Sequence, residues 1–461
     1  EEAHGLQTIH GGDYSYKPNS VVVLCVFICR QQTAIIHSPT PSTPAPSNAM
    51  LAHLERPAGP APGLRRILDD FGLTYFANGL IAFIFSATGP LAVILSVGTR
   101  GGLSQAELAS WVFGVFFVNG LVTLTMSLRY RMPLGFAWTI PGTVLVGPAL
   151  QHLSFAEVIG AFYATSLLVL VMGASGWVKR VMSALPMPIV MGMVAGVFLR
   201  FGLDIVRALD SDVAIAAPMI IAFLLLSASP AWAKRMPPVI GALLIGALLI
   251  GALGRVDTST LGSLAFAQPV VQAPVWSLGA LVELVVPLAI TVLVVQNGQG
   301  TAVLRGAQHE PPVNAIAVAC GVGAFFSAMV GAVSTCLTGP SNALMTSSGK
   351  MDRQYTAALT FGLFGVLFGL LAPTFTGLML AAPKEFIMVL GGLAMLRVLQ
   401  AAFLGSFGGG KFTLGALVSL IVTVADIGMF NIGAAFWGLV AGFGVSWLME
   451  KHDFTALANR A

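Results

Sequence analysis

Charged residues are scarce in this chain of 461 residues. Asp, Glu, Lys and Arg together make up 9% of it, whereas hydrophobic residues make up 56%. A soluble protein of this length carries about 25% charged residues to cover its surface. So few charges suit a surface that faces lipid, so the sequence predicts an integral membrane protein surrounded by a lipid bilayer. It offers no basic stripe for nucleic acid and leaves no room for a sizeable soluble domain.

Chemistry-bearing side chains are equally sparse. The four cysteines have no metal-ligand spacing, and the seven histidines are scattered. No paired His, paired Asp or Ser with a matching base stands out within the apolar segments. We therefore expect no metal, no cofactor and no catalytic residues, and we interpret the chain as a transporter rather than an enzyme.

The first 49 residues differ from the rest of the chain. They contain one short apolar run, 21–28, and a Pro-, Ser- and Thr-rich stretch, 37–47. The run is too short to span a bilayer, and no small-residue cleavage site follows it. We expect residues 1–49 to be a disordered or non-native extension and 50–70, which opens at Met50, to be the cytoplasmic N-terminus.

Apolar segments then follow one another almost without interruption. A spanning helix needs about 20 predominantly apolar residues, which leaves room for about fourteen membrane segments. We place them at 72–97, 108–128, 138–150, 156–175, 186–206, 213–229, 237–254, 279–297, 313–332, 337–347, 355–373, 384–404, 412–428 and 431–449.

The basic residues between these segments predict the orientation. With the N-terminus in the cytoplasm, about fifteen Lys and Arg residues fall inside and about four outside. Cytoplasmic loops of membrane proteins carry such an excess. The sequence thus predicts a multi-pass protein of the bacterial inner membrane with both termini cytoplasmic.

The third and tenth segments are short and broken. The first reads 137–146, with Pro141-Gly142, and the second 335–344, with Gly339-Pro340. Other residues, including Pro186 and Pro383, recur in the same order at matching positions of the two halves of the chain. Seven segments per repeat would invert the second copy, and broken helices at matching positions mark transporter sites near the bilayer midplane. We therefore predict an all-α fold in a 7+7 inverted repeat, with half-helices at segments 3 and 10. Gly and Pro are also simply common in membrane helices, which is the alternative.

Two half-helix N-termini that face a common centre suit an anion, because each offers free N–H groups and the positive end of its dipole. For the hydroxyl and amide side chains around the breaks, helix capping is the alternative to ligand binding, and for Trp138 packing is the alternative to stacking on a planar ligand. The predicted substrate-binding residues are Ser86, Thr88, Trp138, Thr139, Gly142, Thr143, Gln296, Asn297, Gln299, Thr338, Gly339, Ser341 and Asn342.

No carboxylate lies at the breaks, which favours an anion over a cation as the ligand. For proton coupling the candidates are Glu283 and Asp426, both toward segment ends, and the substrate itself is a further carrier of the proton. Arg200 is among the basic residues deepest in the segments. We expect it to pair with Asp204 or with helix-end carbonyls, and a role in substrate attraction or gating is the alternative.

Several runs together resemble the benzoate:proton symporter family. They are Ala137-Trp-Thr-Ile-Pro-Gly142, Pro186-Met-Pro-Ile-Val-Met-Gly-Met-Val-Ala-Gly196, Gln296-Asn-Gly-Gln-Gly300 with Arg305 and Pro311-Pro312, and Ala435-Phe-Trp-Gly-Leu439. The resemblance covers residues 70–450. The chain departs from the family's pattern at Gln299 and at 334–337, both within the expected site.

The resemblance implies an inverted-repeat fold shared with nucleobase and sulfate-type permeases. It implies a core domain, 71–180 and 279–375, and a gate domain, 181–255 and 383–450. It also implies proton-coupled uptake of a small organic anion, benzoate or a related aromatic carboxylate. The alternatives are a nucleobase or sulfate-like permease of the same fold and, from other classes, a channel or a membrane-embedded enzyme. A homodimer through the gate domain is common in related folds, and the sequence leaves oligomeric state and transport direction open.

Overall fold

The structure is a computed structural model that describes residues 54–178, 180, 185–257, 264–347, 349–429 and 433–458. The extension expected at 1–49 lies outside the described residues.

The first half of the chain is a succession of helices that follow the apolar runs. Several have a proline at their first or second position, and proline lacks the N–H that a helix start would leave unpaired. They are α2 (Leu64–Asp70), α3 (Leu73–Ala87), α4 (Gly89–Arg100), α5 (Gln105–Phe113), the π-helical η3 (Gly114–Val118), α6 (Asn119–Tyr130), α7 (Ile140–Ala149), α8 (Phe155–Ser175), α10 (Met187–Ser211), α11 (Val213–Ala228), α12 (Pro230–Arg235) and α13 (Pro238–Ala252).

The second half repeats this pattern. Its elements are α14 (Leu278–Ala280), the π-helical η5 (Leu281–Val285), α15 (Val286–Ile290), the π-helical η6 (Thr291–Gln296), α16 (Asn297–Gly306), α17 (Val313–Met329), α18 (Gly339–Met345), the 3-10 helix η7 (Met351–Arg353), α19 (Tyr355–Leu370), α20 (Ala372–Leu380), α21 (Lys384–Phe407), α22 (Thr413–Ala425), α23 (Ala434–Met449) and α24 (Lys451–Ala458).

Each predicted membrane segment corresponds to a helix or a chain of helices within the described residues. Six helical stretches are long and apolar enough to cross a bilayer, and α19 with α20 forms a seventh that is bent by 75°. Six further apolar helices of 10–17 residues fall on the other predicted segments, and α18 falls on the tenth. The chain is therefore a multi-pass membrane protein, and the count of fourteen spans stays a prediction.

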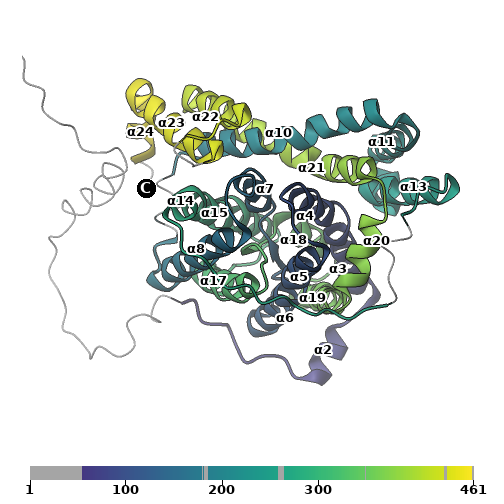
Figure 1. Ribbon diagram of the computed structural model, residues 1–461. Coiled ribbons are helices and arrows are strands. Elements are labelled where there is room, and N and C mark those ends of the chain that lie inside the picture. The colour runs from purple at the N-terminus through teal and green to yellow at the C-terminus, as the bar shows by residue number, and fades with distance from the viewer. Residues whose placement is uncertain are drawn as a thin grey trace, which may run out of the picture. The chain divides into compact units, whose positions relative to one another are not determined.

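The helices pack in two groups, which Figure 1 shows one above the other. We call α3 to α8 together with α14 to α20 the half-helix group, because it contains α7 and α18. We call α10, α11, α13, α21, α22 and α23 the long-helix group. Within the long-helix group α10 packs against α21 and α22, and in the half-helix group α8 packs against α17 and α3 against α19. The two groups meet where α4 packs against α21 and α7 against α10.

A small sheet departs from the all-helical prediction. Strand β1 (Phe136–Trp138) pairs antiparallel with β2 (Thr335–Leu337), so that Ala137 lies opposite Cys336. The two strands precede α7 and α18, and their backbone groups satisfy each other away from water, as non-helical backbone at membrane depth requires. The sheet therefore fixes the two half-helices relative to each other.

The eighth segment is longer than expected. The prediction ends it at 297, whereas α16 continues to Gly306 without a break, after the π-helical turns of η6. Gln296 to Gln299 thus lie on a continuous helix. In the first segment, by contrast, Thr88 leaves helical geometry, with φ −107° and ψ −96°, and separates α3 from α4.

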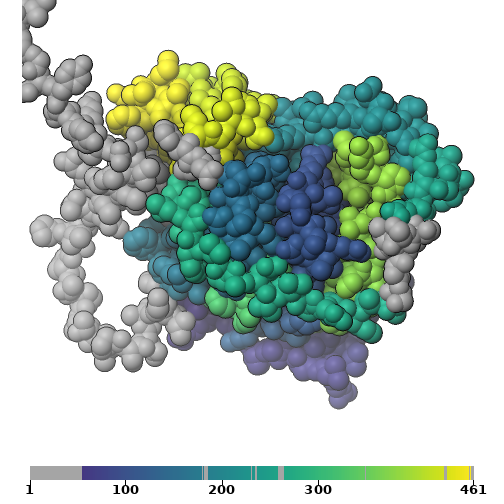
Figure 2. All heavy atoms as spheres, viewed as in Figure 1, coloured from purple at the N-terminus to yellow at the C-terminus, as the bar shows by residue number. Residues whose placement is uncertain are grey.

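The connection between the two halves, residues 264–277, lies across the half-helix group (Figure 2). Its backbone N–H groups donate to the carbonyl oxygens of Leu370, Met329 and Ala156, and the Val270 N–H donates to Ser110 Oγ. One short segment thereby joins the ends of helices that are distant in the sequence.

The segment before α2 caps a helix of the second half. The carboxylate of Glu55 accepts the backbone N–H groups of Asn314 (3.1 Å) and Ala315 (3.2 Å) in the first turn of α17. A carboxylate at this position satisfies free donors and complements the helix dipole.

We expect Glu55→Ala to destabilise the protein by about 1 kcal/mol, the usual cost of losing a helix cap. The matched control is Glu310→Ala, which removes an exposed carboxylate three residues before α17. Thermal unfolding in detergent measures both variants. Equal melting temperatures for the two would contradict a capping role for Glu55.

Candidate functional site

Helix α7 begins at the end of β1, at the centre of the half-helix group. The Thr139 N–H donates to the Ser334 carbonyl (3.0 Å), and Thr139 Oγ1 accepts the Gly142 N–H (3.1 Å). Pro141 has no N–H. The Ile140 N–H is therefore the donor that neither the helix nor its cap satisfies.

Helix α18 begins in the matching position after β2. The Thr338 N–H donates to the Gly135 carbonyl (3.1 Å), but the Thr338 side chain does not cap the helix. Pro340 has no N–H, so the amides of Gly339 and Ser341 are left without an intrahelical partner. Together the two half-helices offer backbone donors and two positive dipole ends, the arrangement that suits an anion.

Asparagine side chains hold the antiparallel pair of β1 and β2 in place. Asn342 donates to the Gly135 carbonyl (3.1 Å) and accepts the Gly135 N–H (3.0 Å), and Asn297 Oδ1 accepts the Leu337 N–H (2.7 Å). Both side chains are fully or almost fully buried. Their amide groups therefore hold the backbone where the two strands pair.

Hydroxyl groups join the half-helices to the neighbouring helices. Thr139 donates to Thr291 on η6 (2.9 Å), and Ser86 on α3 is hydrogen-bonded to Ser341 on α18 (3.2 Å). Thr143 donates to the Thr139 carbonyl within α7. The predicted alternative of capping thus applies to Thr139, whereas Ser86 and Ser341 lie at the start of α18 beside its free amides.

The remaining predicted residues surround this centre. Thr88 donates to the Phe85 carbonyl (3.0 Å) at the break between α3 and α4. Gln296 is buried on η6, whereas Gln299 is exposed, and its side chain lies against Gly339, where a Cβ atom would approach it to 2.5 Å. Gly142 is similarly enclosed, because a Cβ atom there would lie 2.4 Å from the Thr139 methyl group.

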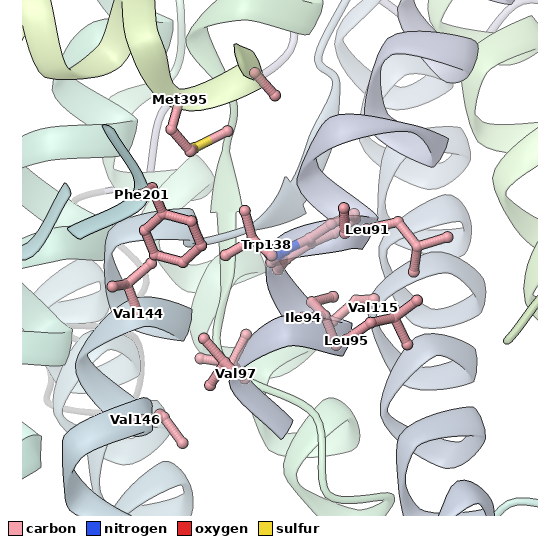
Figure 3. Close-up of a cluster of buried hydrophobic side chains, with 14 of the residues drawn as sticks. Leu91, Ile94, Leu95, Val97, Val115, Trp138, Val144, Val146, Phe201 and Met395 are labelled. Carbon is pink, nitrogen blue, oxygen red and sulfur yellow. The ribbon is translucent and has the colours of Figure 1, made fainter. Parts of the chain in front are cut away.

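Trp138 lies in an apolar cluster next to the start of α7. Its ring is 2% exposed and packs edge-on against Phe116, with ring centroids 5.0 Å apart. Phe201 of α10 and Met395 of α21 belong to the same cluster and bring the long-helix group to it (Figure 3). The indole N–H has no hydrogen-bond partner among the described residues.

A small cavity of about 10 Å³ lies beside Trp138 and Ser86, walled by Phe83, Phe116 and Phe361 among others. That volume holds about one water molecule. An aromatic ring can therefore enter next to Trp138 only when the surrounding side chains move apart.

A second pocket, of about 40 Å³, lies between the two helix groups and contains charged residues. Arg200 of α10 pairs with Asp426 at the end of α22 (2.5 Å), not with Asp204 as the sequence analysis expects. Asp204 instead pairs with Arg100 (2.7 Å) and Arg207 (3.1 Å), because the turn of α10 that carries it lies opposite the end of α4.

The two predicted proton-coupling residues differ in environment. The side chain of Glu283 is 4% exposed and is hydrogen-bonded to His152 (2.9 Å between Nε2 and Oε2), whereas the side chain of Asp426 is 42% exposed. Both carboxylates line the pocket between the groups, and neither lies at the half-helix starts.

Three residues of these two regions, Asn119, Thr291 and His152, were not predicted from the sequence. Asn119 accepts from Thr335 of β2 (2.6 Å) and is a single amide within a long apolar run, a signal that was available in the sequence. His152 has no such signal, because only the fold brings it next to Glu283.

Comparison with known proteins identifies the family. The model of the benzoate membrane transport protein family matches residues 69–448 of this chain. The chain belongs to the benzoate membrane transport family. It is accordingly a membrane transport protein, and the family predicted from the sequence motifs is confirmed.

Curated relatives cover most of the chain. The inner membrane protein YdcO of Escherichia coli (strain K12) is 30% identical over 374 residues, which is 80% of this chain and 94% of that protein. The benzoate membrane transport protein of Acinetobacter baylyi is 25% identical over 394 residues, 84% of this chain and 98% of that protein.

Solved structures show the same fold at low sequence identity. The transmembrane domain of the cyanobacterial bicarbonate transporter BicA has a TM-score of 0.55 and 16% identity, and the alignment covers 83% of this chain and 98% of that domain. The SLC26A9 structure has a TM-score of 0.59 and 13% identity, with 97% of this chain and 72% of that chain covered. The predicted inverted-repeat membrane-transporter fold is thereby confirmed.

Proposed function

We propose that the protein imports benzoate or a related aromatic carboxylate across the bacterial inner membrane together with a proton. The observation that carries the proposal is the pair of half-helix starts with free amides at Ile140, Gly339 and Ser341. Family membership and the name of the Acinetobacter relative support benzoate as the substrate class. In this proposal the half-helix group is the core domain, the long-helix group is the gate domain, and both termini are cytoplasmic.

The carboxylate and the ring of such a substrate would contact different parts of the site. The carboxylate would accept hydrogen bonds from the free amides and from Ser86 and Ser341, where the helix dipoles favour negative charge. The ring would lie against Trp138, Phe201 and Met395, an apolar surface that suits an aromatic group. Exposed Gln299, next to Gly339, would contact the substrate on its way in or out.

Transport requires the two groups to move relative to each other. The ring-binding surface contains residues of both groups, and the small cavity beside Trp138 is too small for a benzene ring. Binding would therefore separate side chains of the two groups, and the resulting exposure of the site to one side and then the other is alternating access.

Uptake of radiolabelled benzoate into proteoliposomes with an imposed inward proton gradient tests the proposal. We expect saturable uptake that a protonophore abolishes, with neither uracil nor sulfate competing. Uptake of uracil or sulfate in place of benzoate would assign the fold to a nucleobase or inorganic-anion substrate. A flux that never saturates would indicate a channel.

A further inference from the structure

Glu283 lies where the two helix groups meet. It belongs to the π-helical segment η5 of the half-helix group, and its side chain is almost fully buried. His152, in the turn between α7 and α8, donates to or accepts from its Oε2 at 2.9 Å. The buried carboxylate of Glu283 and the partly exposed imidazole of His152 therefore form one hydrogen-bonded pair.

The same carboxylate reaches across to the long-helix group. The backbone of Gly433, the residue that precedes α23, lies against it, with its N–H placed to stabilise the charged carboxylate. The approach is close, because a Cβ atom at Gly433 would lie 2.4 Å from Glu283 Oε1. Glu283 thus links a buried side chain of one group to the backbone of the other.

The other titratable groups around Glu283 are few among the described residues. The elements that pack against η5 are α7, α8, α14 and α15, and of these only α8 carries such groups. Glu157 there is held in the capping box of α8 by Ser154, and the Tyr163 ring packs against Phe325. Across the pocket, Arg200 and Asp426 neutralise each other in an ion pair.

We propose that Glu283 and His152 bind the coupled proton, and that the contact between Glu283 and Gly433 holds the two helix groups together until the proton binds. We call this contact the latch. The inference rests on the proposed proton-coupled function and names the proton site of that cycle. With Glu283 ionised, the charge-assisted hydrogen bond from the Gly433 N–H holds the groups together, since such bonds are about twice as strong as neutral ones. A proton taken from the pocket neutralises the carboxylate and weakens this bond, so that the groups separate on this side.

The latch also sets the order in which the proton binds, the substrate enters and the proton leaves. A proton that opens the pocket side gives the substrate access from the side where the proton concentration is high. Return of the groups to contact brings the Gly433 N–H back to the carboxylate, which favours its ionised form, and the proton passes to water on the side that the site then faces. His152 shares the proton with Glu283 and keeps the ionised carboxylate hydrogen-bonded while it is buried.

Accessibility of the pocket to a water-soluble reagent tests the latch without any transport. Ala435 lines the pocket, so Ala435→Cys is labelled in the full-length protein with a membrane-impermeant methanethiosulfonate. Cys25 and Cys29 are replaced by Ser in every variant. The rate is divided by that of Ala252→Cys, an exposed position at the end of α13, to remove the effect of pH on the thiol itself.

In the wild-type background we expect the rate ratio to rise about tenfold between about pH 8 and about pH 5.5, because one linked proton changes an equilibrium by up to tenfold per pH unit. Glu283→Gln cannot ionise, so its ratio should be high and independent of pH. Gly433→Ala removes the latch sterically and should also be high at every pH. Glu157→Gln, a neighbouring carboxylate, should keep the wild-type profile.

A flat wild-type ratio, or a Glu283→Gln ratio that still follows pH, would overturn the proposal. If Glu283→Gln does not fold, Gly433→Ala carries the test, because its ratio must then lose the pH dependence. Labelling needs no substrate, so a failure to transport benzoate would refute the proposed substrate and leave the latch standing. A rate ratio that does not depend on pH, together with intact benzoate uptake, would refute the latch and leave the proposed substrate standing.

Discussion

Asn297→Ala is expected to lower benzoate uptake at least about tenfold. The substitution leaves the Leu337 N–H of β2 buried without its 2.7 Å partner. An unsatisfied buried donor costs about 1–3 kcal/mol, and 1.4 kcal/mol corresponds to a factor of ten. No water at this depth replaces the lost acceptor. Strand β2 would then no longer hold the start of α18, and the free amides there, in position.

Uptake kinetics and thermal unfolding of the same preparations measure this effect. The control is Thr125→Ala, because the Thr125 hydroxyl is exposed and donates only to carbonyls of its own helix, those of Leu121 and Val122. We expect the control to behave as wild type. Near-normal uptake by Asn297→Ala would mean that β2 does not need this anchor and that the amide has another role.

Gly89→Ala is expected to reduce transport by a factor of about ten or more, and Ala394→Gly in the same chain should restore it. Gly89 begins α4 of the half-helix group, and a Cβ atom there would lie 2.0 Å from the Cβ of Ala394 on α21. Overpacking of this kind costs about 1–3 kcal/mol. The contact joins the two groups, so the cost applies to the conformation in which they touch.

The double substitution exchanges which side carries the methyl group and so restores the space. Gly444→Ala is the control, because nothing lies within 4 Å of a Cβ atom at this helical position. It should leave uptake unchanged and slightly stabilise α23, since Ala favours a helix over Gly. Failure of Ala394→Gly to rescue Gly89→Ala would show that the loss arises elsewhere than at this contact.

Hydropathy and the positions of proline and glycine were enough to predict the helical segments and the two half-helices. Both signals are local in the sequence, because an apolar run of a given length and a Pro-Gly break act on their own residues. The continuation of α16 beyond Asn297 was missed, because Gly298 and Gly300 look like a break. Gly300 is instead required by close packing, since a Cβ atom there would lie 2.8 Å from Leu337.

The hydrogen-bond and ion-pair partners of the site residues could not be predicted from such local signals. The sequence identified Thr139 and Asn342 as polar residues at the breaks, but their partners, Thr291 and Gly135, lie 152 and 207 positions away. The strand pair and the asparagine anchors depend on how the two halves cross in space. For the same reason Arg200 was matched with the nearby Asp204, whereas the fold brings it to Asp426.

A structure of the protein with an iodinated benzoate bound tests the central claim, that an aromatic carboxylate is held between the two half-helix starts. We predict the iodine signal in the apolar cluster of Trp138, Phe201 and Met395, with the carboxylate toward the amides of Ile140 and Gly339. An iodine signal in the pocket lined by Arg200 and Glu283, or none at a defined position, would contradict the account.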